Sequence, residues 1–127
     1  MRTISFLLAM TIAAGLLAGG PVYADSGAIR TMANIAMNMN HFPSDEDKAA
    51  LKTIIDSDDA SDEEAEIALA MSNMEHKLSE EDAERLQDIV DDPDADEDAQ
   101  ALARVLLGFN HSAGSEAKAT LAALAAN

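Results

Sequence analysis

The three histidines of this 127-residue chain, His41, His76 and His111, are separated by two equal intervals of 35 residues. Imidazole is the commonest metal ligand among side chains, and a thioether sulfur beside it favours copper. Met37 lies four residues before His41, one helical turn away, so these two residues form a candidate copper pair. The other two histidines have no methionine at this distance, so the pair does not recur.

The equal spacing favours a structural role for the histidines over a metal site. In stacked helical units, we expect equivalent side chains about one helix spacing apart, roughly 8–10 Å, which is too far for two imidazoles to share an ion. A histidine in the last turn of a helix instead hydrogen-bonds the terminal carbonyl groups. We therefore interpret His41, His76 and His111 as a repeat signature. A catalytic role is not expected, because no nucleophile recurs beside them.

Acidic residues gather in two turns, and one of these turns contains candidate calcium ligands. Asp92, Asp94 and Asp96 alternate in the way that the oxygen ligands of a calcium-binding loop do. The glycine that such a loop needs is replaced by Glu97, and the glutamate at its twelfth position by Ala103. Capping and solvation also account for these carboxylates. We expect no cofactor beyond weak binding of Ca²⁺ or copper.

Hydrophobic residues recur at fixed distances from each histidine. The positions nine residues before, ten after and thirteen after hold Met32, Ile67 and Leu102, then Leu51, Leu86 and Leu121, then Ile54, Ile89 and Leu124. Within each unit the apolar spacings of three and four residues indicate helices and exclude strands. A fixed period of this length is typical of a repeat architecture. The sequence therefore predicts an all-α fold of three stacked helical hairpins, a short α-solenoid-like array.

The expected units span about 25–60, 61–95 and 96–127, with two helices in each. Helices are predicted over about 27–41, 45–56, 62–76, 80–91, 97–110 and 115–126. Their starts are marked by Ser44, Ser61, Ser79 and Asp96, each followed by acidic residues that suit the positive end of a helix. The sequence signal for a helix start near Ser115 is weaker than these four.

Residues 1–24 have the three parts of a secretory signal peptide. Arg2 supplies the basic start, Ile4 to Ala18 the apolar run, and Val22-Tyr23-Ala24 the small-x-small cleavage site. The apolar run is shorter than the roughly 20 residues that span a bilayer. We expect cleavage after Ala24, export to the periplasm or the medium, and no stable membrane insertion afterwards. The single domain, residues 25–127, has no cysteine and must be held together by burial.

The net charge and the absence of known catalytic motifs disfavour several classes of function and partner. A formal net charge of -16 disfavours nucleic acids and anionic membrane surfaces as partners. The chain has no phosphate-binding glycine loop and no nucleophile elbow, so we expect no enzyme. The sequence favours a non-catalytic protein-interaction or scaffold module. The alternative is a divalent-cation (calcium) or copper-binding protein of the cell envelope.

The expected partner is another envelope protein, or a second copy bound through the C-terminal unit. From Ala99 to Asn127 the chain has two basic residues and one acidic residue, whereas the preceding part is strongly acidic. The predicted last helix presents an uncharged candidate interface of Ala119, Ala122, Ala123 and Ala126.

Overall fold

The computed structural model describes residues 27–126, and the expected signal peptide lies outside the described residues. Six helices make up this part of the chain, and no strand occurs in it. They are α2 (Ala28–Asn38), α3 (Asp45–Asp56), α4 (Asp62–Ser72), α5 (Glu80–Asp91), α6 (Glu97–Leu107) and α7 (Ser115–Ala126). The predicted all-α fold of three two-helix units is confirmed.

Local capping sets the starts of four helices. The Ser44 hydroxyl accepts a hydrogen bond from the Asp47 N–H, and the Asp47 carboxylate accepts one from the Ser44 N–H. Ser61 and Glu64 form the same reciprocal pair at α4. Ser79 and Asp96 cap α5 and α6 in a similar way. These interactions satisfy amide groups that have no partner inside a helix, and they confirm the predicted starts.

The first helix of each unit ends earlier than the sequence predicts. α2, α4 and α6 end at Asn38, Ser72 and Leu107, three or four residues before the expected ends. Each histidine that follows has a positive φ angle, which a right-handed helix excludes. The histidines therefore lie in the loops after the helices, and the expected position in the last helical turn is wrong.

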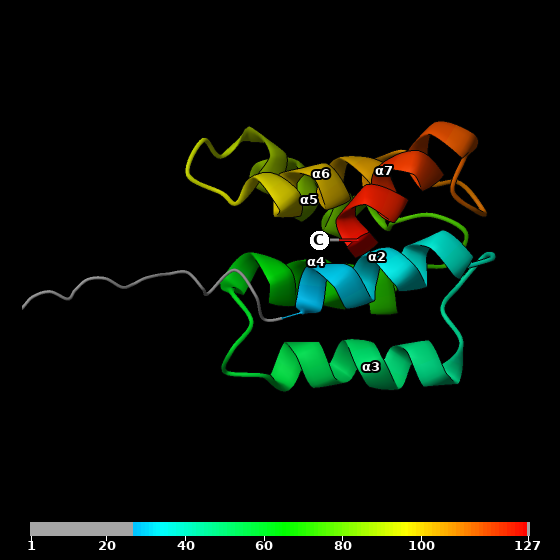
Figure 1. Cartoon of the computed structure of the whole chain (residues 1–127), viewed down its shortest axis with the longest axis horizontal. Coiled ribbons are helices and arrows are strands. Elements are labelled where there is room, and N and C mark those ends of the chain that lie inside the picture. The colour runs from blue at the N-terminus through cyan, green and yellow to red at the C-terminus, as the bar shows by residue number, and fades with distance from the viewer. Residues whose placement is uncertain (1–26, 127) are drawn as a thin grey trace, which may run out of the picture.

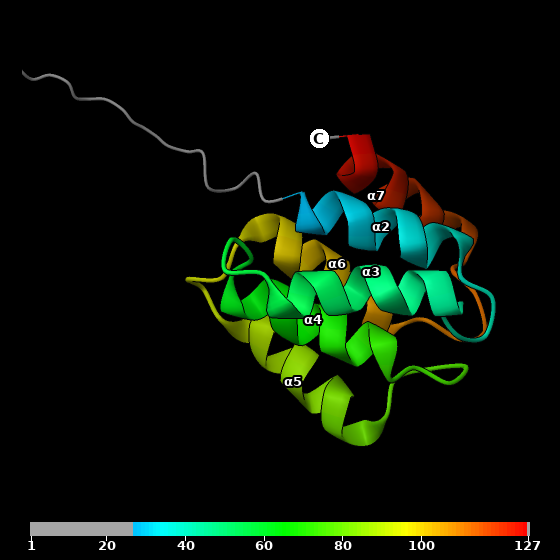
Figure 2. The ribbon, with the colours of Figure 1, turned by 90° about the horizontal axis from the view of Figure 1, so that it is seen from below.

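The six helices form a closed arrangement. α2, α4 and α6 contact one another, while α3 packs extensively on α4, α5 on α6, and α7 on α2. Figures 1 and 2 both show α7, the last described helix, beside α2, the first described one. Each second helix of a unit thus packs mainly on the first helix of the next unit, and the third unit packs back on the first. The repeat array closes into a ring.

The predicted core positions are buried. The hydrophobic residues nine positions before, ten after and thirteen after each histidine are at most 7% exposed. Ala33, Ala68 and Ala103 lie at equivalent places on α2, α4 and α6 and are fully buried, so small side chains accompany the close approach of these helices. Among residues 27–126, no helix has the length and apolar character needed to cross a membrane.

The loops fall at two opposite ends of the molecule (Figure 1). The α2–α3, α4–α5 and α6–α7 loops gather at one end, which we call the histidine end because each loop contains one histidine. The acidic α3–α4 and α5–α6 loops lie at the other end.

Candidate functional site

The three histidines are joined to one another through their backbones at the histidine end. The N–H of His41 donates to the carbonyl of His111, that of His76 to the carbonyl of His41, and that of His111 to the carbonyl of His76. The three N···O distances are 2.5–2.7 Å. We call this arrangement the histidine ring. It needs all three units, because each histidine bonds both of the others.

The backbone of the histidine ring has a conformation that glycine adopts freely and most residues with a side chain adopt rarely. The φ angles of His41, His76 and His111 are 74°, 71° and 69°. The Phe42 N–H donates to the Asn40 carbonyl at 2.9 Å, so His41 is the middle residue of a three-residue turn. A positive φ costs a residue other than glycine about 1–2 kcal/mol. Glycine would avoid this cost at all three positions, yet each unit has histidine.

The three imidazole rings form a compact cluster. Their centroids are 5.0 Å apart for His41 and His76, 5.1 Å for His41 and His111, and 5.0 Å for His76 and His111, in edge-to-face geometry. The expected separation of 8–10 Å is therefore wrong, because the units close around an axis instead of stacking in a line. His41 is half-buried and the other two are exposed.

The expected side-chain role of the histidines is also absent from the described part of the chain. Within residues 27–126, no imidazole nitrogen takes part in a hydrogen bond, and the contacts to carbonyl groups are made by the backbone N–H groups instead. The imidazoles thus contact one another and solvent while their nitrogen atoms keep their capacity to bind.

Four positions hold the same residue in all three units. Two of them are fully buried, the alanines Ala33, Ala68 and Ala103 and the leucines Leu51, Leu86 and Leu121. The glutamates Glu46, Glu81 and Glu116 lie in the first turns of α3, α5 and α7, where the helix dipole favours a negative charge. Packing and helix capping account for these three positions. Neither accounts for the histidine side chain.

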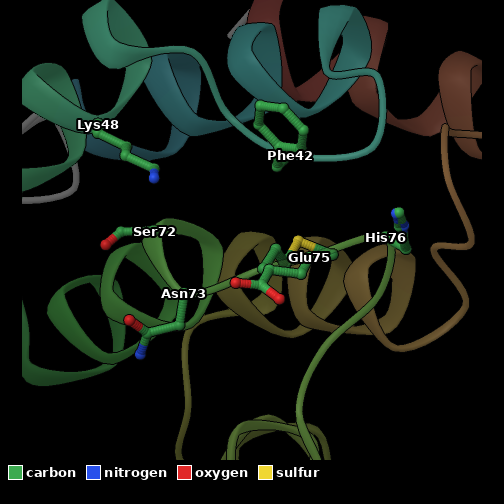
Figure 3. A pocket seen from close by; sticks show the side chains of 7 residues that line it. Phe42, Lys48, Ser72, Asn73, Glu75 and His76 are labelled. Carbon is green, nitrogen blue, oxygen red and sulfur yellow. The ribbon is translucent and has the colours of Figure 1, made fainter.

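A pocket of about 590 Å³ opens beside the histidine ring, between the first and second units. It is lined by Phe42, Lys48, Ser72, Asn73, Met74, Glu75 and His76, and we call it the Phe42 pocket (Figure 3). Phe42 is 57% exposed. In Figure 3 it lies across the opening from Asn73 and Glu75, and Lys48 extends toward the opening from α3.

Sequence reasoning missed this pocket, although one signal was present. The residue after each histidine is Phe42, Lys77 or Ser112, so the repeat does not require an aromatic ring there. The sequence does not predict that Lys48 and Asn73 line the pocket, because their positions there depend on how the first and second units pack against each other.

The structure separates the residues that were candidates for a metal site. Asp92, Asp94 and Asp96 lie in the α5–α6 loop, at the opposite end from His41 (Figure 1). The Asp92 carboxylate accepts from the Asp94 N–H, and the Asp96 carboxylate caps α6. Met37 packs against the core. Within residues 27–126, no group of three or more His, Asp or Glu side chains is already arranged to hold a metal ion.

The alanine face predicted on the last helix is exposed. Ala119, Ala122, Ala123 and Ala126 are open to solvent, while Leu121 and Leu124 of the same helix are buried. Its use as an interface stays a prediction. The histidine ring and the Phe42 pocket are the two features of the histidine end that the fold itself does not explain. Comparison of the chain with protein-family models, with curated proteins and with solved structures found no match.

Proposed function

We propose that the mature chain is an exported, non-catalytic binding module that recognises an arginine-bearing segment of another protein in the Phe42 pocket. The observation that carries this proposal is the exposed ring of Phe42 at the rim of that pocket. Large aromatic side chains in such positions supply much of the binding energy of protein interfaces.

The Phe42 ring is not needed to build the unit in which it lies. The second and third units fold in the same way with Lys77 and Ser112 at this place. Only one other large apolar side chain in the described part of the chain is exposed, Leu69, at 38%. An aromatic ring that the fold does not use, on a surface rich in carboxylates, supports a role in recognition.

The charge of the whole chain and the Glu75 carboxylate in the pocket lining favour a cationic partner. The chain has a net charge of -16, which attracts basic proteins and repels acidic ones. An arginine guanidinium can stack on the Phe42 ring while it donates to the Glu75 carboxylate across the opening. Lys48 lies on another side of the pocket, where its ammonium group is a donor for the backbone carbonyl groups of the same segment.

The proposal is tested by titrating the ¹⁵N-labelled chain with a short glycine-arginine peptide and following amide chemical shifts. We expect saturable shifts at Phe42 and at residues 72–76, and smaller ones with a glycine-glutamate peptide. Phe42→Ser, which copies the third unit, should weaken binding about two- to fivefold, the equivalent of about 0.5–1 kcal/mol for an exposed cation–π contact.

The matched control is Leu69→Ser, which removes the other exposed apolar side chain and lies outside the pocket. It should leave the affinity unchanged. The proposal is wrong if the shifts spread over the acidic α3–α4 and α5–α6 loops, or if Phe42→Ser binds the arginine peptide as tightly as the unmodified chain does.

A further inference from the structure

We propose that the histidine ring binds one divalent transition-metal ion of the class that prefers imidazole, such as Zn²⁺ or Cu²⁺, through the side chains of His41, His76 and His111. This site is separate from the Phe42 pocket in its ligand chemistry, although His76 borders both. It uses the three imidazoles together, one from each unit.

The distances between the imidazole rings suit a shared ion. In a triangle with sides of 5.0, 5.0 and 5.1 Å, the centre lies about 2.9 Å from each corner. An ion bound 2.0–2.1 Å from a ring nitrogen lies about 3.2 Å from the centroid of that ring. An ion slightly above the plane of the three centroids therefore reaches all three rings. This position leaves one side open for a water molecule, as in three-histidine zinc sites.

The rings must turn to bring their nitrogen atoms onto the ion. In the structure they meet edge to face, and their donor atoms are not arranged around a common point. Rotation is unhindered by hydrogen bonds, because within residues 27–126 the imidazole nitrogens take part in none. The ring of N–H to carbonyl bonds holds the three backbones together while the imidazoles turn.

Three further observations support a ligand role. Histidine recurs at a positive φ angle in all three units, where glycine would be less strained, and this recurrence favours a role for the side chain. The imidazoles are also reachable from solvent, which gives an ion a path of entry. The net charge of -16 raises the local concentration of cations around the molecule.

The test is calorimetric titration of the purified full chain with Zn²⁺, in buffer with excess Ca²⁺ to occupy surface carboxylates. We expect one Zn²⁺ per chain. Replacing Zn²⁺ with Co²⁺ should give the visible absorption bands of a four-coordinate ion. His111→Asn removes one proposed ligand and should lower the affinity at least as much as loss of an outer-shell partner does, about tenfold or more. This variant should still fold, because asparagine tolerates a positive φ.

Variants and probes distinguish this site from its alternatives. His111 does not line the Phe42 pocket, and Phe42 has no metal-binding group, so Phe42→Ser should leave Zn²⁺ binding unchanged. The metal proposal is overturned if His111→Asn binds Zn²⁺ as tightly as the unmodified chain, if excess Ca²⁺ abolishes binding, or if the stoichiometry differs from one. A folded His111→Asn variant, checked by circular dichroism, makes each of these outcomes decisive.

Discussion

Replacing His111 with glycine should give a more stable protein than replacing it with alanine. The φ angle of this residue is 69°, which glycine adopts freely and alanine does not. Both replacements remove the imidazole and its contacts with the other two rings, so the difference between them comes from the backbone alone.

The size of the difference follows from two opposing effects. The positive φ costs alanine about 1–2 kcal/mol, whereas glycine loses about 0.5–1 kcal/mol more than alanine through the greater freedom of its unfolded chain. The glycine variant should therefore be more stable by about 0–1.5 kcal/mol, which corresponds to a rise in Tm of at most about 6–12 °C in a domain of this size.

Thermal unfolding followed by circular dichroism at one protein concentration measures this difference. Ala119 is exposed on α7 and supplies the control, because Ala119→Gly places glycine inside a helix, where it should lower stability by about 1 kcal/mol. At position 111 we expect glycine to give a more stable protein than alanine, and at position 119 a less stable one. If His111→Ala is more stable than His111→Gly, the positive φ is not a source of strain, and the argument that histidine is kept for its side chain fails.

Leu121→Ala should destabilise the protein by about 2–5 kcal/mol and should raise amide hydrogen exchange in α2 as well as in α7, because the two helices pack on each other; a rise confined to α7 would contradict closure of the ring. Ser61→Ala should lower the free energy of unfolding by about 1 kcal/mol in a urea titration, because it removes the capping pair with Glu64, and an unchanged urea midpoint would show that the pair adds nothing. Expression of the whole sequence in a bacterial host with a secretory pathway should yield a mature chain that begins at Asp25, which intact-protein mass spectrometry detects; a mass that still includes residues 1–24 would count against export.

Local signals made much of the fold predictable. α3, α5 and α7 begin and end where the sequence indicates, because serine or acidic residues at their starts and apolar spacings of three and four are read within a few residues. The buried positions follow from the same spacing. The ends of α2, α4 and α6 were placed too late, since histidine gives no strong local signal for a positive φ.

The candidate site depended on information that is not local. Whether three units stack in a line or close into a ring is decided by the small rotation between neighbouring units, which no single residue reports. In a linear stack the imidazoles would lie about one helix spacing apart. Because the units close into a ring, the centroids of His41 and His76 are 5.0 Å apart. The recurrence of histidine was visible in the sequence, but its distance to the other histidines was not, and that distance determines whether one ion can be shared.

Closure removes the open ends that a linear array of these units would have. In an open array, α2 and α7 would each leave uncovered the face that packs on a neighbouring unit. These two helices cover each other, so neither forms an open end. The hydrogen bonds of the histidine ring lead to the same conclusion. Without the third unit, the His41 N–H and the His76 carbonyl would each lose their partner. All the backbone hydrogen bonds of the histidine ring therefore form only with three units.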